Sequence, residues 1–309
     1  MEFALKLLTL NCWGLPQPYP IGSKDRIRRL EAIGRRLAEE DFDIVALQEV
    51  WSVHDYEMIK AIVASVLPYG FYFHSGLMGS GACILSKGEI VDTLMHRYSL
   101  NGYPHHIHRG DWFGGKVIGL ARIIYKGLNI YSYVTHIHAE YDRDSDLYLP
   151  HRVVQAYEMS QFIKATSASA DVYFLMGDLN FESIDLGYRL VLSNAHLKDA
   201  WVDRRSGAEL DIDDGNTCDI PSNSYVPKES LARWPKGKRI DYIMYNSRSE
   251  VEVVPAKAYT DLHRIPPDND ISFSDHEAVV AEFSGKIKSP DDDTKAMRAI
   301  GVRAGRRVL

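Results

Sequence analysis

The chain has 309 residues, of which 45% are hydrophobic, 11% aromatic and 25% charged. A chain of this size and composition can bury a large core, which excludes intrinsic disorder and fits one large α/β domain or two small ones. The formal net charge of −6 argues against a surface built mainly for nucleic-acid phosphates, although a local basic groove is compatible with it.

Short apolar runs rich in β-branched and aromatic residues predict a series of strands. In chain order these runs cover residues 5–11, 42–49, 81–87, 116–126, 128–136, 171–180, 239–246 and 277–283. Two segments between them, 23–40 and 151–165, have helical spacing. Helices are too few to separate every pair of strands, so hairpins must join some of them. The predicted fold class is α/β, a sandwich of mixed sheets covered outside by helices.

Two stretches lie outside this pattern. Residues 204–238 are rich in Gly, Pro, Asp and Ser and predict long irregular loops, which usually line a binding site or are disordered. The last residues form a polar spacer followed by a basic segment. We therefore expect one folded domain over residues 1–285 and a polar, then basic, tail over residues 286–309.

Targeting signals and cysteine chemistry are not evident in the sequence. The first residues carry an acid and a lysine within an apolar run, which favours a first strand over a secretory signal. No stretch is apolar over the length that spans a bilayer. Cys12, Cys83 and Cys218 are odd in number and far apart, which indicates neither a disulfide framework nor a thiolate zinc site, and a reducing compartment is expected.

Polar side chains fall at the ends of the predicted strands, where layered α/β proteins collect ligands because the sheet fixes the backbone and the loops leave room. They are Asn11, Glu49, His136, Asp178, Asn180, Asp275 and His276. Carboxylates gathered at one sheet end repel one another, so a positive charge should lie among them. Carboxylate and amide oxygens suit Mg²⁺ or Mn²⁺, which would also bring a phosphate group into the site.

Each of these residues also has an ordinary structural interpretation. Asn11 could be a turn residue and Glu49 an acid at a helix N-terminus. His136 and His138 could form a zinc pair, but no third ligand of suitable spacing follows, and the "HHIH" run at 105–108 is better interpreted as a polar surface cluster. Only the joint occurrence of all the pieces in one order favours a functional site.

Taken in order, "TLNCWG", "LQEVW", "THIHAEY", "MGDLN", "RIDYIMY" and "SDHEAV" resemble the motifs of the endonuclease/exonuclease/phosphatase superfamily, over residues 5–283. The longer strings "GSGACILSK", "LNGYPHHIHRGDWFGGKVIGL" and "HRVVQAYEMSQFI" resemble the neutral sphingomyelinases of animals, which are Mg²⁺-dependent phospholipases C. The resemblance implies a DNase I-like four-layer α/β sandwich, in which two packed sheets are flanked by helices. It also implies hydrolysis of sphingomyelin to ceramide and phosphocholine at intracellular membranes, such as the endoplasmic reticulum.

Position by position, the resemblance implies a role for each strand-end residue. Glu49 matches the Mg²⁺ ligand, assisted by Asn11, and Asp275 matches an acid on the metal side of the site. Residues that match the superfamily's phosphate and transition-state positions are His136, Asp178 and Asn180.

The same resemblance makes His276 the general base and Asp241 the acid that orients it. An imidazole near its ordinary pKa can take a proton from water at neutral pH, and a carboxylate on its other nitrogen fixes the tautomer. The residues leave open whether one metal ion or two take part. They also leave open whether Mg²⁺, His136 or a protonated acid meets the departing oxygen.

The stretch "HRGDWFGGKVIG" places Asp111 five residues before Lys116, and resembles an acid and lysine pair that switches a loop near the active site of neutral sphingomyelinases. Lys116 could instead be an ordinary solvated lysine. Trp112 and Phe113 are suited to a membrane interface, where aromatic rings are favoured. Glu277 has no predicted role and is expected to be solvated.

Other functions share these motifs. The substrate could be lyso-platelet-activating factor or an inositol phosphosphingolipid, and a DNase I-like or abasic endonuclease has the same catalytic residues. No concentrated basic stretch occurs in residues 1–283 beyond the helix arginines near Arg28 and Arg35, so no nucleic-acid partner is expected. A non-catalytic scaffold would have no use for the full residue set.

The basic tail has two expected uses. The resembling enzymes continue into C-terminal transmembrane helices, so the tail could flank such a segment. It could also bind an anionic lipid surface, with each Lys or Arg contributing on the order of 1 kcal/mol.

Overall fold

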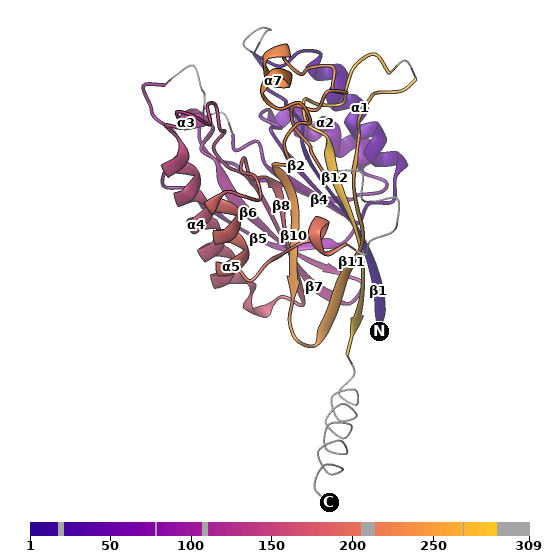
Figure 1. Cartoon of the computed structure of the whole chain (residues 1–309). Helices are drawn as coiled ribbons and strands as arrows, with labels where there is room; N and C mark the ends of the chain where they lie inside the picture. The colour runs from indigo at the N-terminus through magenta and orange to yellow at the C-terminus, as the bar shows by residue number, and fades with distance from the viewer. Residues whose placement is uncertain (18–21, 78, 107–110, 205–213, 268, 289–309) are drawn as a thin grey trace, which may run out of the picture.

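The computed structural model describes residues 1–17, 22–77, 79–106, 111–204, 214–267 and 269–288 (Figure 1). Within these residues two six-stranded mixed sheets pack face to face, and helices cover their outer faces. The predicted four-layer α/β sandwich is confirmed.

The first sheet is built from strands at both ends of the described chain. Its order is β11-β12-β1-β2-β4-β3, and β1 pairs in parallel with β2 and antiparallel with β12. The strands are β1 (Glu2–Asn11), β2 (Ile44–Gln48), β3 (Tyr69–Tyr72), β4 (Cys83–Ser86), β11 (Val251–Asp261) and β12 (Ala278–Ile287).

The second sheet comes from the middle of the chain. Its order is β5-β6-β7-β8-β10-β9, in which β7 and β8 are parallel and β8 and β10 antiparallel. The strands are β5 (Glu89–Arg97), β6 (Val117–Tyr125), β7 (Leu128–His136), β8 (Val172–Asp178), β9 (Lys198–Asp199) and β10 (Asp241–Ser247).

Two pairs of helices close the sandwich. Helices α1 (Arg26–Glu39) and α2 (Val53–Val63) share a buried cluster with β1, β2 and β4, whereas α4 (Leu149–Thr166) and α5 (Leu186–Asn194) share one with β7 and β8. Figure 1 shows α4 and α5 lying together against the second sheet. The short helices are α3 (Asp111–Gly114), η2 (Ser167–Ser169), α6 (Ala200–Asp203) and α7 (Lys228–Arg233).

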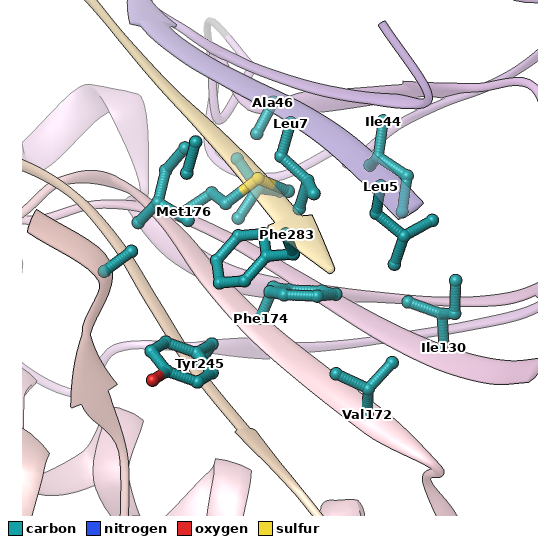
Figure 2. Packing of buried hydrophobic residues seen from close by; sticks show 14 of the residues in the cluster. Leu5, Leu7, Ile44, Ala46, Ile130, Val172, Phe174, Met176, Tyr245 and Phe283 are labelled. Carbon is teal, nitrogen blue, oxygen red and sulfur yellow. The ribbon is translucent and has the colours of Figure 1, made fainter. Parts of the chain in front are cut away.

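A third apolar cluster lies between the two sheets and joins them. Phe283 on β12 packs against Phe174 on β8 and Tyr245 on β10, with ring centroids 5.0 and 5.1 Å apart (Figure 2). Leu7 from β1 and Met176 from β8 belong to the same cluster. Burial of this area from both sheets fixes how they are aligned.

All eight predicted strands and both predicted helices are present, with ends that differ by a few residues. The prediction missed β3, β5, β9 and β11 and the helices α2 and α5. Strand β5 is mostly exposed and so lacks an apolar pattern, and β11 is an edge strand that carries Pro255 beside a register shift.

The predicted irregular region and tail are described only in part. Residues 214–238 consist largely of loops, as expected, and include the short helix α7. Strand β12 extends to Ile287, so its last two residues fall within the expected tail, and residues 289–309 lie outside the described part. Among the described residues no helix combines the length and apolar character needed to cross a membrane.

Candidate active site

Three neighbouring strands of the second sheet bring three polar side chains to one end of it. His136 ends β7, Asp178 ends β8 and Asp241 begins β10. In the ladders His136 is the partner of Asp178, and Asp178 is the partner of Asp241. All three are buried. Strand register therefore places them side by side, and a slip of one residue would separate them.

The first sheet faces this group with residues from three of its own segments. Asn11 ends β1, Glu49 directly follows β2, and His276 precedes β12. Glu49 has a φ of 56°, a left-handed conformation that is unfavourable by about 1–2 kcal/mol for a residue other than glycine. Its carbonyl accepts the Gly14 N–H at 2.9 Å, and a side chain at Gly14 would meet that oxygen at 2.4 Å. The glycine thus permits the conformation that turns Glu49 toward the site.

Asp178 Oδ2 lies at the centre of the site. It accepts a hydrogen bond from Asn11 Nδ2 at 3.0 Å, and it lies 3.5 Å from His136 Nε2 and 4.0 Å from His276 Nε2. Glu49 Oε1 is 3.9 Å from His136 Nε2 and accepts from Asn11 Nδ2 at 3.2 Å. One oxygen atom therefore connects residues that come from both sheets.

His276 and Asp241 form a hydrogen-bonded pair. His276 Nδ1 lies 2.8 Å from Asp241 Oδ2, and both side chains are buried. With the Nδ1 proton donated to the carboxylate, a neutral His276 presents Nε2 as an acceptor on the side of Asp178.

The amide side chains of the site act as donors. Asn11 presents its NH₂ group to Glu49 and Asp178, while its Oδ1 accepts the Trp13 N–H at 3.0 Å. Asn180 donates its backbone N–H to Asp178 Oδ1 at 2.9 Å and its side-chain amide to the Ile137 carbonyl at 3.2 Å. In this arrangement Asn11 orients the two carboxylates, and its role as an oxygen ligand stays a prediction.

Lys116 links the site to the short helix α3. Its Nζ lies 3.0 Å from Asp111 Oδ1 and 3.0 Å from His136 Nε2, and it donates to the Ile137 carbonyl at 2.6 Å. Lys116 is only 2% exposed, so its interpretation as a solvated lysine is wrong. The predicted Asp111 and Lys116 pair is a direct ion pair that reaches into the site.

Charge and burial shift the pKa values of the site. Burial raises the pKa of Glu49, with a contribution from Asp275, and it also raises the pKa of Asp275 itself. Burial and the neighbouring Asp241 raise the pKa of Asp178 to about 7. Crowded acids of this kind are typical of functional sites and favour a bound cation.

The two histidines shift in opposite directions. Burial and the nearby Lys116 ammonium lower the pKa of His136 well below its ordinary value, so this ring is neutral at pH 7. Burial also acts to lower the pKa of His276, but the Asp241 carboxylate outweighs it and the net pKa lies well above the ordinary value. The surroundings thus separate the pKa values of two imidazoles at one site.

The donor set fits a hard divalent cation. Ligand atoms of Asp178, Asp241 and His276 all lie within 4.8 Å of one another. Burial raises the pKa values of Asp178, Glu49 and Asp275, with a contribution from neighbouring acids for the first two, and a bound cation would offset the cost of keeping these carboxylates charged. His276 and Asp241 in this group are paired with each other, which leaves Asp178 as its member available to a cation. Asn11 connects Asp178 to Glu49, and the ligand roles of Glu49, Asn11 and Asp275 stay predictions. Oxygen-rich surroundings of this kind suit Mg²⁺.

Sequence reasoning missed two residues that hold the site and misjudged a third. Thr217 donates to Asp241 Oδ2 at 2.6 Å, and Trp51 Nε1 donates to Glu49 Oε2 at 3.4 Å. Thr217 lies in the irregular stretch, where no periodicity marks it, whereas Trp51 lies two residues after Glu49 and could have been found from that proximity. Glu277 is buried and lies 2.7 Å from His263 Nδ1, so the expectation that it is solvated is wrong.

Comparison with known proteins relates this geometry to a family. The model of the Endonuclease/Exonuclease/phosphatase family matches residues 8–276. A relative from Caenorhabditis elegans is 48% identical over 294 residues, which cover 91% of this chain and 66% of that protein. Sphingomyelin phosphodiesterase 2 from Mus musculus is 42% identical over 295 residues, which cover 95% of this chain and 68% of that protein.

A further relative is the inositol phosphosphingolipids phospholipase C from Schizosaccharomyces pombe, 34% identical over 313 residues, which cover 96% of this chain and 72% of that protein. The chain spans about two thirds of the length of the curated relatives that it matches.

Solved structures share the fold at low sequence identity. Beta toxin from Staphylococcus aureus superposes with a TM-score of 0.68 at 22% identity, covering 90% of this chain and 99% of that chain. A mutant of the same toxin with bound magnesium ions gives a TM-score of 0.63 at 19% identity. The match covers 93% of this chain and 100% of that chain.

Proposed function

Since the chain belongs to the Endonuclease/Exonuclease/phosphatase family, we propose that it hydrolyses sphingomyelin to ceramide and phosphocholine with Mg²⁺ as its cofactor. The proposal of phosphodiester hydrolysis rests on the His276 and Asp241 pair, 2.8 Å apart, which lies beside the central Asp178 carboxylate. The substrate is supported by the 42% identity to sphingomyelin phosphodiesterase 2 over nearly the whole chain.

In the proposed reaction His276 is the general base. Its Nδ1 donates to Asp241, which fixes the ring and stabilises the imidazolium that forms, and its Nε2 takes a proton from the attacking water. Water attacks the phosphodiester phosphorus, and the ceramide oxygen leaves on the opposite side. His136, Asp178 and Asn180 keep the phosphate and transition-state roles that the resemblance implies, and the Lys116 ammonium adds positive charge beside His136.

The residues proposed to hold Mg²⁺ are Glu49, Asp178 and Asp275. Asn11 fixes the carboxylates of Glu49 and Asp178, which it contacts. When bound, the cation polarises a phosphoryl oxygen, offsets the negative charge of the transition state and favours the neutral form of the nearby imidazole. A related toxin structure with bound magnesium ions supports this choice of metal.

Sphingomyelin is a membrane lipid, so the proposed enzyme works at an intracellular membrane surface. Trp112 is 44% exposed on α3, next to the Asp111 that pairs with Lys116, and its ring is suited to the membrane interface. Phe113, beside it, is half-buried. The contribution of the basic tail to binding anionic lipid is part of the same proposal and concerns residues outside the described part.

A second candidate substrate is an inositol phosphosphingolipid. The 34% identity to the yeast phospholipase C over 96% of the chain favours it as the alternative. Both substrates present a phosphodiester on a ceramide, so the same catalytic residues would serve either.

The proposal is tested by assaying the purified chain on four substrates in parallel, each with Mg²⁺ and with chelator. The substrates are sphingomyelin in mixed micelles, lyso-platelet-activating factor, an inositol phosphosphingolipid and an abasic DNA duplex. We expect the fastest turnover on sphingomyelin, loss of it in chelator and recovery on adding Mg²⁺. His276→Ala should reduce kcat by about 10²-fold or more without a change in circular dichroism.

Each other outcome has a defined meaning. Faster turnover of the inositol lipid would replace the substrate by the second candidate. Cleavage of the duplex and of no lipid would overturn the proposal, and full activity in chelator would remove Mg²⁺ from it.

A further inference from the structure

Thr217 contacts the Asp241 carboxylate of the His276 and Asp241 pair. Its Oγ1 donates to Asp241 Oδ2 at 2.6 Å, the same oxygen that lies 2.8 Å from His276 Nδ1. Thr217 is fully buried, and so is the oxygen it binds. The hydroxyl therefore has a charged acceptor in a dry environment, where hydrogen bonds are strong and directional.

The backbone around Thr217 ties together the two segments that carry the pair. Thr217 N–H donates to the Lys238 carbonyl at 2.8 Å, just before β10 and Asp241. The Thr217 carbonyl accepts the Glu277 N–H at 2.8 Å, directly after His276. The neighbouring Cys218 forms isolated β-bridges with both Lys238 and His276. Residues 217 and 218 thus act as a short strand between the acid and the imidazole.

The Asp241 carboxylate has few other restraints. Its Oδ1 has no hydrogen-bond partner among the described residues, so its orientation depends on what Oδ2 contacts. Apart from the ring of His276, the side chain that contacts Oδ2 is Thr217. Without the hydroxyl, the carboxylate could rotate about its terminal torsion and carry the imidazole with it.

We infer that Thr217 is a positioning residue that holds Asp241 in the rotamer required to orient His276. The inference rests on the proposed role of His276 as general base. Thr217 touches no reacting atom, and it acts on the reaction only through Asp241. Its backbone contacts hold the main chain, whereas its hydroxyl sets the side chain of the acid.

The matched variants are Thr217→Val, which replaces the hydroxyl with a methyl group of similar size, and Thr217→Ser, which keeps the hydroxyl. We expect Thr217→Val to lower kcat on sphingomyelin about tenfold, which corresponds to about 1.4 kcal/mol, with KM unchanged. Thr217→Ser should keep kcat within about threefold of wild type. In the His276→Ala background Thr217→Val should cause no further loss, because both changes act through one unit.

A second measurement follows the pair without substrate. In ¹⁵N-histidine NMR spectra we expect a downfield His276 Nδ1 proton, present in wild type and Thr217→Ser and shifted or broadened in Thr217→Val. This signal tests the inference even where the wild type fails to cleave sphingomyelin, an outcome that would overturn the proposed function alone. An unchanged signal with unchanged kcat in Thr217→Val would overturn the inference. Equal losses in the Val and Ser variants, or an additive loss in the His276→Ala background, would also overturn it.

Discussion

At the scale of single residues, the Asp111 and Lys116 pair is the part of the site most dependent on charge. Lys116 is buried between Asp111, His136 and the Ile137 carbonyl, and Tyr141 donates to Asp111 Oδ2 at 2.7 Å. Burial acts to raise the pKa of Asp111, but Lys116 and the hydrogen bonds outweigh it, so the pKa lies below its ordinary value. A buried ammonium of this kind depends on the neighbouring carboxylate.

Asp111→Asn should therefore destabilise the protein in a pH-dependent way. At pH 7 it leaves Lys116 buried without its anionic partner, and we expect the free energy of unfolding to fall by about 3–5 kcal/mol. A carboxyl whose pKa is lowered on folding contributes its full stability above the unfolded value of about 3.9, and loses it as the pH falls through the folded value. The difference between wild type and variant should therefore shrink below about pH 4.

Urea unfolding at pH 7 and in acid measures this difference. The control is Asp144→Asn, whose side chain is 91% exposed and paired with Arg233, and which should change stability by less than about 0.5 kcal/mol. A loss for Asp111→Asn that is constant from pH 7 into acid would contradict the charge argument.

The sequence identified most of the polar residues of the site but not how they contact one another. Glu49, His136, Asp178 and His276 could be identified only because they occur together, at the ends of apolar runs and in one order along the chain. The orientation of the Asn11 amide could not be predicted, since it depends on residues from three segments distant in sequence. Thr217 could not be found because its role comes from a loop whose path the sequence pattern does not define.

At the scale of elements, the close approach of β7 and β8 is what brings His136 beside Asp178. Gly177 on β8 has a φ of 151°, and a Cβ there would lie 2.0 Å from the Thr135 carbonyl oxygen on β7. The obstacle is backbone, which cannot move aside as a flexible side chain can. A glycine at this position is therefore required for the register that positions Asp178.

Gly177→Ala should force the two strands apart at the site. We expect the free energy of unfolding to fall by about 1–3 kcal/mol or more, and activity to fall further than stability alone would explain, because Asp178 is displaced. Thermal unfolding and kcat at 25 °C measure the two effects. Gly34→Ala on α1 is the matched control, since its new Cβ would meet only the Ile62 side chain, at 3.0 Å. Equal effects of the two substitutions would argue against the strand contact.

Element prediction succeeded where burial imposes a pattern and failed where it does not. The continuous apolar runs of β2, β4 and β8 are buried on both faces, so they are visible in the sequence. Strand β3 has four residues, β9 has two, and β5 is largely exposed, so neither length nor alternation marks them. Their positions are fixed by pairing with neighbours that are distant in the chain.

At the scale of the whole molecule, the site depends on the alignment of two sheets. Phe283, Phe174 and Tyr245 hold β12 against β8 and β10, and these strands carry or adjoin His276, Asp178 and Asp241 (Figure 2). The protein interior is packed about as densely as an organic crystal, so a void there disturbs the packing of residues some distance away. The core between the sheets thus determines the distance between His276 and the central Asp178 carboxylate.

Phe283→Ala should weaken this alignment. We expect a loss of about 3–5 kcal/mol in the free energy of unfolding, together with a lower kcat for the fraction that stays folded. Denaturant unfolding measures the loss of stability, and single-turnover assays measure the loss of activity. Val202→Ala, at a side chain that is 64% exposed, should change neither by much. A stable Phe283→Ala protein with wild-type kcat would show that the sheets are aligned by other contacts.

The strand order has a consequence for when the candidate site is assembled during synthesis. The second sheet is one continuous stretch, residues 89–247, whereas the first sheet needs β11 and β12 from residues 251–287, with β12 inserted between β11 and β1. A nascent chain leaving the ribosome can thus complete the second sheet while β1 still lacks a partner on one side. His276, the proposed base, emerges immediately before the strand that fills this gap. Translation must therefore pass the last strand before the two sheets, and with them the two halves of the proposed site, are complete.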